Sequence, residues 1–282
     1  MKLLIGTAQF GFKYGLNKKK IKKVEIKIIK KILKINSIKF FDTAMNYGES
    51  EKILGNLKIK KKVITKIKLP LKKPKDLKKW FESKVNNSLK KLKVKSLYGL
   101  LIHDTSDILG KNKEFLNIIL DYQKKKLIMK VGISVYELKE IQKILKVWTP
   151  DIIQFPLNVF DQRFLKNNLL KKLKKLNIEI YARSCFLQGI LLNSSLKIGS
   201  IKSKKLFKKF IGWCSLNKID QITACLHFIK KNKYIDYLII GFDNSIHLNQ
   251  IINSFNRKLI LVPNIFTCNE KKLIDPRKWS YN

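Results

Sequence analysis

Short apolar runs alternate along the chain with longer segments in which apolar residues and lysines are mixed. Eight of these runs are nearly continuous in Ile, Leu, Val and Phe, which is typical of strands that are covered on both faces. The predicted strands span residues 3–8, 39–43, 62–66, 98–103, 130–134, 151–155, 179–183 and 237–241.

The segments between the predicted strands carry apolar residues at the spacing of a helix. Leu77, Phe81 and Val85 recur on one face of such a segment, and they follow Asp76, a residue type favoured at helix starts. Two further helices are expected at residues 202–216 and 220–231, because the stretch between the last two strands is longer than one crossover needs.

Eight strands with intervening helices in a chain of 282 residues predict an α/β fold, a single (β/α)8 TIM barrel that forms one domain over residues 1–282. Residues 263–282 are expected to pack on the barrel as an irregular C-terminal tail. A doubly wound open sheet is the alternative. It would require a glycine-rich phosphate loop after the first strand, and GTAQFGFKYG at residues 6–15 lacks the GxGxxG spacing.

The net charge of +41, from 61 Lys and Arg against 20 Asp and Glu, first suggests a nucleic-acid-binding protein. However, only four of the basic residues are arginines, and the lysines are dispersed among many Ile and Asn residues, whose codons are also A/T-rich. The pattern therefore favours a compositional bias, with no specific nucleic-acid partner. The positive field would still attract anionic ligands.

Other sequence features limit the class of protein. No apolar run approaches the roughly 18 residues of a membrane helix, and no signal-peptide core develops near the N-terminus. The four cysteines lie far apart without a CxxC pair, so neither a disulfide framework nor a metal site is expected. These features predict a cytoplasmic protein with no membrane association.

The carboxyl ends of three predicted strands carry Asp42, Lys66 and His103, and Tyr47 follows the second strand closely. In a barrel these ends converge on one mouth. A nearby ammonium favours ionisation of a phenol, so Lys66 could make Tyr47 an effective general acid while Asp42 holds Lys66. His103 could donate a hydrogen bond to a carbonyl oxygen. This combination suits hydride reduction of a carbonyl.

The sequence resembles the aldo-keto reductase family. The motif FDTAMNYGESEKILG at residues 41–55 matches the family pattern around its catalytic Asp and Tyr. The family's Lys and His have counterparts in VITKI at 63–67 and LLIHD at 100–104. Similarity continues to the eighth strand through VGIS, IIQFPLNVFD, ARSCFLQGILL and IIGFDNSIHLNQI, and GTAQFGFKYG resembles the family's opening strand and loop.

The resemblance implies a nicotinamide dinucleotide bound across the barrel mouth, with Asp42, Tyr47, Lys66 and His103 as the catalytic tetrad. Ser134 and Gln154 match residues that hold the nicotinamide carboxamide. The remaining cofactor-binding positions follow the last two strands, namely Arg183, Ser184, Leu187, Gln188, Gly241, Asn244, Ser245 and Gln250.

Several positions depart from the family pattern. Arg183 replaces the aromatic residue that commonly stacks on the nicotinamide, and it could meet either the substrate or a cofactor phosphate. Gly241 and His247 stand where basic residues often grip a 2′-phosphate, and Asp243 would repel one. NADP(H), the usual family choice, is therefore favoured only weakly over NAD(H).

The sequence thus predicts NAD(P)H-dependent reduction of a small-molecule aldehyde or ketone, such as a sugar or another anionic metabolite, by a monomer or weak homo-oligomer. The alternative is a non-catalytic relative that binds a nucleotide or a protein partner. The presence of both Tyr47 and Lys66 argues against that alternative. His227 is expected to be structural, whereas His247 could lie on a helix surface or contact the nucleotide.

Overall fold

Eight parallel strands close into one barrel in which each strand pairs with the next and β8 pairs with β1. The computed structural model describes residues 1–11, 23–109, 113–196 and 198–279. The strands are β1 (Lys2–Gly6), β2 (Phe40–Asp42), β3 (Lys62–Ile67), β4 (Leu97–Ile102), β5 (Ile128–Ser134), β6 (Ile152–Pro156), β7 (Glu179–Arg183) and β8 (Tyr237–Ile240).

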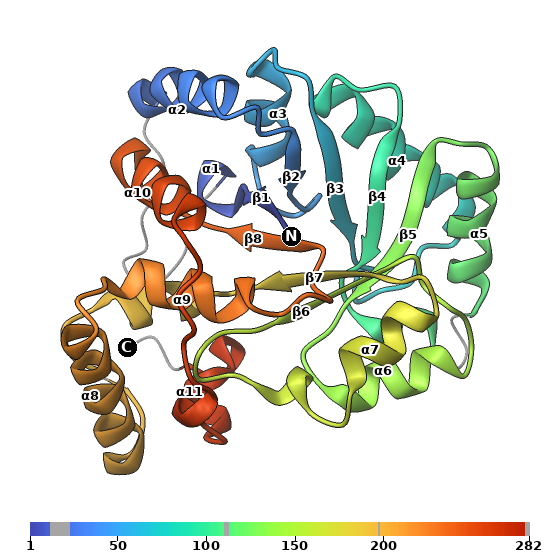
Figure 1. The fold of residues 1–282 in the computed structure, drawn as a ribbon. Coiled ribbons are helices and arrows are strands. Elements are labelled where there is room, and N and C mark those ends of the chain that lie inside the picture. Colours follow the sequence, from blue (N-terminus) through green and yellow to red (C-terminus); the bar gives the residue numbers. More distant parts are fainter. Residues whose placement is uncertain (12–22, 110–112, 197, 280–282) are drawn as a thin grey trace.

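Helices surround the strands, so the predicted (β/α)8 barrel is confirmed (Figure 1). The α-helices are α1 (Ala8–Gly11), α2 (Lys23–Ile35), α3 (Ser50–Asn56), α4 (Leu77–Leu92), α5 (Lys113–Lys124), α6 (Leu138–Leu145), α7 (Leu169–Lys175), α8 (Ile201–Leu216), α9 (Gln221–Lys230), α10 (Ser245–Asn256) and α11 (Lys271–Ile274). Residues 12–15 of the opening motif and 280–282 of the tail lie outside the described residues.

Helix α4 forms where the sequence predicts it, for local reasons. The side chain of Asp76 accepts a hydrogen bond from the backbone N–H of Lys79 at 2.8 Å, which satisfies one free donor of the first turn. Phe81 and Val85 are fully buried on the face that meets the barrel. Helices α8 and α9 also occupy the two predicted ranges to within one residue, and Asp220 caps α9 in the same way.

Packed side chains fill the barrel interior below its mouth. Leu4, Ile64, Leu101, Ile152 and Tyr181 are fully buried and form one cluster with Tyr237 and Ile239. Parallel strands with both faces covered bury such residues inside the barrel and against the helices alike. The interior is therefore a solid core rather than a channel.

A polar cluster lies beside this interior core. The hydroxyl groups of Tyr98 and Tyr181 both donate hydrogen bonds to the carboxylate of Glu179, and Lys130 Nζ lies 2.5 Å from the same carboxylate. Glu179 is the first residue of β7, so the cluster lies at the amino ends of the strands. The end of the barrel opposite the predicted site is thus closed by paired polar groups.

The C-terminal tail packs on the rest of the chain. Phe266, Leu273 and Ile274 are buried, and the backbone N–H of Cys268 donates to Phe160 O at 2.8 Å. Arg277, near the end of the described tail, forms an ion pair with Asp275, which is itself fully buried. The tail is therefore held by apolar contacts and by specific polar ones.

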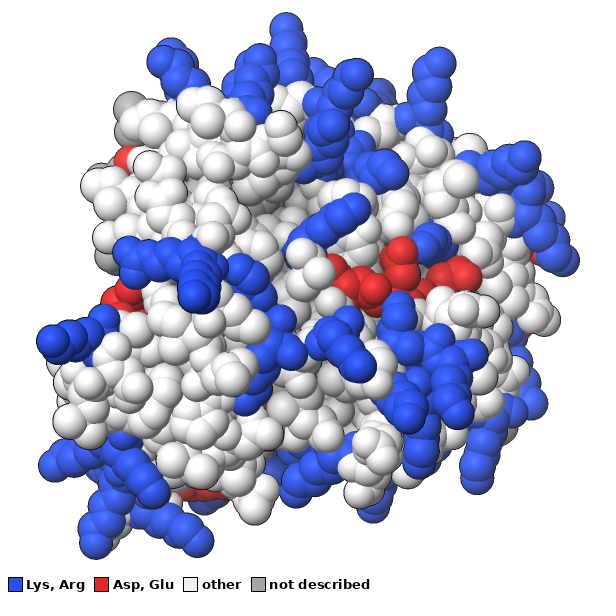
Figure 2. Space-filling view, in the orientation of Figure 1, with Lys and Arg blue, Asp and Glu red and all other residues white. Residues whose placement is uncertain are grey.

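The surface reflects the composition. On the face drawn in Figure 2, lysine and arginine side chains project over most elements rather than gathering in one patch. Within the described part of the chain, no helix combines the length and the apolar character of a membrane span.

Two helical glycines provide a test of the packing. A Cβ at Gly55 in α3 would lie 2.0 Å from Lys91 O, a backbone atom of α4, whereas a Cβ at Gly212 in α8 would meet nothing within 4 Å. We expect Gly55→Ala to lower the free energy of unfolding by about 1–3 kcal/mol through overpacking. Gly212→Ala should raise it by roughly 0.5–1 kcal/mol, because alanine favours the helix. Urea denaturation measures both changes, and equal effects would contradict this packing of α3 on α4.

Candidate active site

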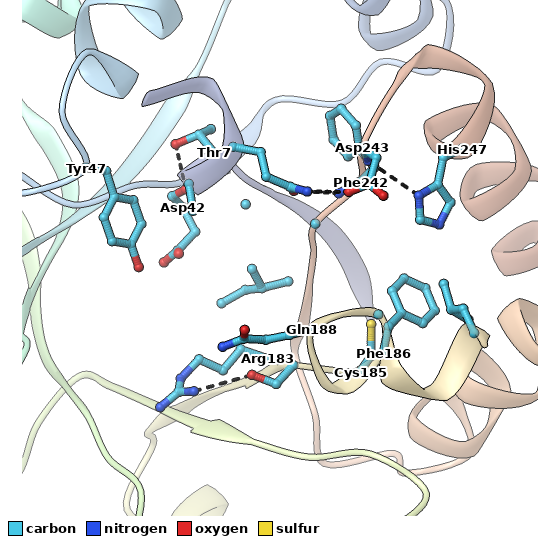
Figure 3. Close-up of a pocket in the computed structure, with 18 of the residues that line it drawn as sticks. Thr7, Asp42, Tyr47, Arg183, Cys185, Phe186, Gln188, Phe242, Asp243 and His247 are labelled. Carbon is cyan, nitrogen blue, oxygen red and sulfur yellow. Dashed lines mark hydrogen bonds between the residues drawn. The ribbon is translucent and has the colours of Figure 1, made fainter. Parts of the chain in front are cut away.

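A cavity of about 490 Å³ opens at the carboxyl ends of the strands, where barrel enzymes place their chemistry. Its walls come from the ends of the strands, the loops after them and the first turns of α10 (Figure 3). The four residues predicted as catalytic all line it: Asp42, Tyr47, Lys66 and His103.

A buried ion pair lies at the base of this cavity. Lys66 Nζ donates to Asp42 Oδ2 at 2.5 Å and to Thr43 O at 2.9 Å, and the Lys66 side chain is 2% exposed. Gln154 Nε2 donates to the other carboxylate oxygen, Asp42 Oδ1, at 2.8 Å. Both oxygens of Asp42 are therefore engaged, one by β3 and one by β6.

Burial lowers the pKa of Lys66 because it penalises the charged ammonium. The carboxylate of Asp42 opposes this effect, and the positive charge of Arg183 adds to it. The charge of Lys66 therefore depends on its contact with Asp42.

Tyr47 stands above this ion pair in the loop after β2. Its ring centroid lies 5.4 Å from Lys66 Nζ, so the ammonium faces the phenol ring. The loop is fixed by its backbone, because a Cβ at Gly11 would lie only 1.7 Å from Tyr47 O. Only glycine at position 11 permits α1 to approach so closely.

His103 lies across from Tyr47, with ring centroids 6.3 Å apart and the rings nearly perpendicular. Burial lowers the pKa of His103 to about 3, and the positive charges of Lys66 and Arg183 act in the same direction. The imidazole is therefore neutral near pH 7, so that one ring nitrogen carries a hydrogen and can donate.

The side chain of Gln154 is aimed so that its carbonyl oxygen lacks a donor. A carboxylate can only accept, so the amide NH2 faces Asp42 and Oε1 faces away. Gln154 is fully buried, and Oε1 has no hydrogen-bond partner among the described residues. Ser134, 3% exposed, pairs with Gln154 in the strand register and also lines the cavity. A primary amide, such as the carboxamide of nicotinamide, would supply the missing donor.

The cavity continues to the loop between β8 and α10. Asn244 caps α10 by accepting from the backbone N–H of His247 at 2.8 Å, and His247 Nδ1 accepts from the backbone N–H of Asp243 at 3.4 Å. Gln9 joins this loop to the start of the chain, since its Nε2 donates to Asp243 Oδ1 at 2.5 Å. His247 thus lines the cavity, and its contact with a nucleotide stays a prediction.

Sequence reasoning missed Gln9. Its partner Asp243 lies 234 residues away, and the only available signal was the position of Gln9 in a segment that resembles the family's opening loop.

Two of the predicted cofactor-binding residues do not reach the cavity wall. Leu187 is 1% exposed and belongs to the hydrophobic core, and Ser245 is buried with its backbone N–H donating to Glu25 Oε2 at 2.8 Å. The other predicted positions line the cavity: Ser134, Gln154, Arg183, Ser184, Gln188, Gly241, Asn244 and Gln250.

His227 lies apart from this cavity, as expected. It is fully buried in α9, where Nε2 bonds to Ser254 O at 2.9 Å and Nδ1 accepts from the backbone N–H of Ile260. Both ring nitrogens serve to join α9 to the segment around α10.

The aldo/keto reductase family model matches residues 2–260, nearly the whole chain. The chain belongs to the aldo/keto reductase family. Members of this family use nicotinamide cofactors to reduce carbonyl compounds, so membership implies NAD(P)H-dependent carbonyl reduction.

Solved structures of similar fold agree with this assignment. The aldo-keto reductase AKR11C1 from Bacillus halodurans has a TM-score of 0.75 at 15% identity, with 92% of this chain and 88% of that chain covered. The glycerol dehydrogenase AKR11B4 from Gluconobacter oxydans has a TM-score of 0.70 at 16% identity, with 92% and 87% covered. At such low identity these similarities concern the fold alone. No curated protein matches this aldo/keto reductase in sequence.

The depressed pKa of His103 gives a direct test of the site. An unfolded histidine binds its proton near pH 6.5, whereas His103 in the fold binds it only near pH 3. This residue should therefore lower the stability of the fold as the pH falls from about 6.5 toward 3, and its ring should stay neutral down to about pH 4. NMR titration of the imidazole nitrogens measures the pKa of His103, and the His103→Gln variant identifies its signal. A midpoint near 6.5 would contradict the buried geometry.

Proposed function

We propose that this aldo/keto reductase reduces an aldehyde or ketone with Tyr47 as proton donor and with Asp42, Lys66 and His103 as the other catalytic residues. The observation that carries the proposal is the buried Lys66–Asp42 ion pair, which faces the Tyr47 ring opposite a neutral His103. Together these groups provide an acid, a charge that acts on it and a hydrogen-bond donor at the wall of one cavity.

The bound nicotinamide would supply the hydride. As negative charge develops on the carbonyl oxygen, His103 donates a hydrogen bond to that oxygen from its neutral imidazole. Tyr47 transfers its phenolic proton to the same oxygen, and the positive charge of Lys66 stabilises the phenolate that remains. Asp42 keeps Lys66 charged and directed toward Tyr47.

The residues at the base of the cavity fit the cofactor. The unpaired Oε1 of Gln154 would accept a hydrogen bond from the carboxamide NH2, beside Ser134. We assign the adenosine side of the cofactor to the loop after β8 and the start of α10, following the family resemblance, with contacts from Gly241, Asn244 and Gln250. Ser184 and Gln188 would lie along the pyrophosphate.

Two carboxylates near the start of α10 bear on the choice of nucleotide. Glu25, from α2, accepts from the backbone N–H of Ser245, and Asp243 directly precedes the cap residue Asn244. A 2′-phosphate here would meet negative charge, and one of the helix N–H groups that could bind it is already occupied. We therefore propose a preference for NAD(H), the reverse of the weak NADP(H) preference that the sequence suggested.

The proposal also includes the substrate class, the domain organisation, the oligomeric state and the location of the enzyme. We propose a small-molecule carbonyl substrate, a single domain over residues 1–282 and a monomer or weak homo-oligomer without a nucleic-acid partner. A cytoplasmic location agrees with the four cysteines, which are all buried and free of disulfides.

The first prediction of this proposal concerns Tyr47. Tyr47→Phe removes the proton donor but keeps the ring, so kcat for carbonyl reduction should fall by at least about 100-fold while NADH binding is retained. NADH and NADPH oxidation against an aldehyde and ketone panel measures turnover, and fluorescence titration measures binding. Tyr234→Phe is the matched control, because Tyr234 precedes β8 and lies outside the cavity lining.

Equal turnover by the wild type and Tyr47→Phe would refute the assignment of Tyr47. Cofactor binding without turnover of any carbonyl by the wild type would instead support the non-catalytic alternative.

The second prediction concerns Glu25. Glu25→Gln keeps an acceptor for Ser245 N–H but removes one negative charge, so NADPH should bind about fivefold more tightly while NADH binding changes little. Separate fluorescence titrations with the two nucleotides measure the ratio of the NADPH and NADH dissociation constants. Glu114→Gln, which alters an exposed carboxylate paired with Lys73, is the control. An unchanged ratio, or tighter NADPH than NADH binding by the wild type, would overturn the NAD(H) preference.

A further inference from the structure

Arg183 differs from the other three arginines in its ionic partners. Arg163 pairs with Asp161 and Glu137, Arg257 with Asp220, and Arg277 with Asp275. Arg183, at the end of β7, forms no ion pair with any carboxylate of the described residues. It donates instead to neutral acceptors, namely Val135 O at 3.2 Å and Ser184 Oγ at 3.4 Å.

The guanidinium of Arg183 is held in place by stacking. It lies 4.1 Å from the ring centroid of Tyr136, and the guanidinium of Arg277 lies 3.7 Å from the same centroid. Arg277 is fixed in turn by the fully buried carboxylate of Asp275. One tyrosine therefore stacks with two cations, of which only Arg277 has a carboxylate to balance its charge.

Arg183 lies on the reaction side of the cavity. In Figure 3 its guanidinium extends toward the side that carries Tyr47 and Asp42, away from Phe186 and His247. Its positive charge also lowers the pKa of both Lys66 and His103, which requires it to lie near them. Arg183 and Lys66 thus bring two positive charges to this part of the cavity, where Asp42 balances one.

We propose that Arg183 binds an anionic group, a carboxylate or a phosphate, carried by the carbonyl substrate. This inference rests on the proposed function and adds to it the substrate class. A guanidinium has five donor hydrogens and a planar fork that matches two oxygens of such a group. The hydrogen bonds of Arg183 to Val135 O and Ser184 Oγ leave donors free for it. The stacked Tyr136 holds the fork in position before the substrate arrives, which reduces the entropic cost of binding.

The experiment compares charged and neutral aldehydes of matched shape at saturating NADH. The pairs are 4-carboxybenzaldehyde with methyl 4-formylbenzoate, and glyceraldehyde 3-phosphate with glyceraldehyde, so that carboxylate and phosphate are tested separately. The variants are Arg183→Met, which removes the charge, and Arg183→Lys, which keeps the charge but removes the fork. Arg257→Met is the control, because Arg257 is exposed and lies outside the cavity lining.

We expect Arg183→Met to raise KM for at least one charged aldehyde by about 10- to 100-fold, with less than a twofold change for its neutral partner. Arg183→Lys should give an intermediate KM for the charged aldehyde. The Kd of NADH, from fluorescence titration, should stay within twofold of the wild type. Calorimetry with the alcohol product 4-(hydroxymethyl)benzoate should show the same loss of affinity without turnover.

Three results would overturn the inference. One is an equal rise in KM for the charged and neutral aldehydes. Another is a parallel weakening of NADH binding, which would show that Arg183 contacts the cofactor phosphates. The third is a wild type that turns over the neutral aldehydes as well as the charged ones. If the wild type reduces no aldehyde but binds 4-(hydroxymethyl)benzoate through Arg183, the anion site stands and the proposed function fails.

Discussion

The ion pair between Asp42 and Lys66 is the interaction on which the geometry of the cavity depends. Two charges removed from water are stable only when each is well paired, and removal of one partner leaves an uncompensated charge that costs several kcal/mol. Asp42 meets this requirement with both oxygens, one bound to Lys66 and the other to Gln154. The register of the barrel makes this possible, because β2 pairs with β3 while β6 contributes from across the interior.

The orientation of other groups follows from this pair. Asp42 fixes the amide of Gln154 with its NH2 toward the carboxylate, and it holds Lys66 beneath the Tyr47 ring. The resulting positive charge acts on His103 and helps to keep the imidazole neutral. A single carboxylate at the end of β2 thus fixes the amide of Gln154 and, through Lys66, places a positive charge beside Tyr47 and His103.

Much of the fold could be predicted because its signals are local. Continuous apolar runs mark the strands, and Asp76 and Asp220 mark helix starts within a few residues of the groups they cap. The strand-end rule then brings Asp42, Lys66 and His103 together without knowledge of any contact. Gln9, Glu25 and Tyr136 could not be found in this way. Their contacts, with Asp243, Ser245 and two arginines, join segments far apart in the chain, and no periodic pattern records them.

The basic residues differ in their burial and in their ionic partners. On the face drawn in Figure 2, lysines project from the outer surface, where their charges are solvated, whereas Lys66 is buried and paired with Asp42. The four arginines differ in their ion pairs. Three have carboxylate partners, and Arg183 has none among the described residues.

The closed end of the barrel has a kinetic consequence. Leu4, Ile64 and Tyr181 leave no passage through the interior, and the Glu179 cluster lies at the amino ends of the strands. Every ligand must therefore enter and leave by the same mouth. Ser134 and Gln154 line this cavity, so a nicotinamide held by them would bind before a substrate that covers it and leave after it. On the proposed function, the packed floor imposes a compulsory order on the catalytic cycle.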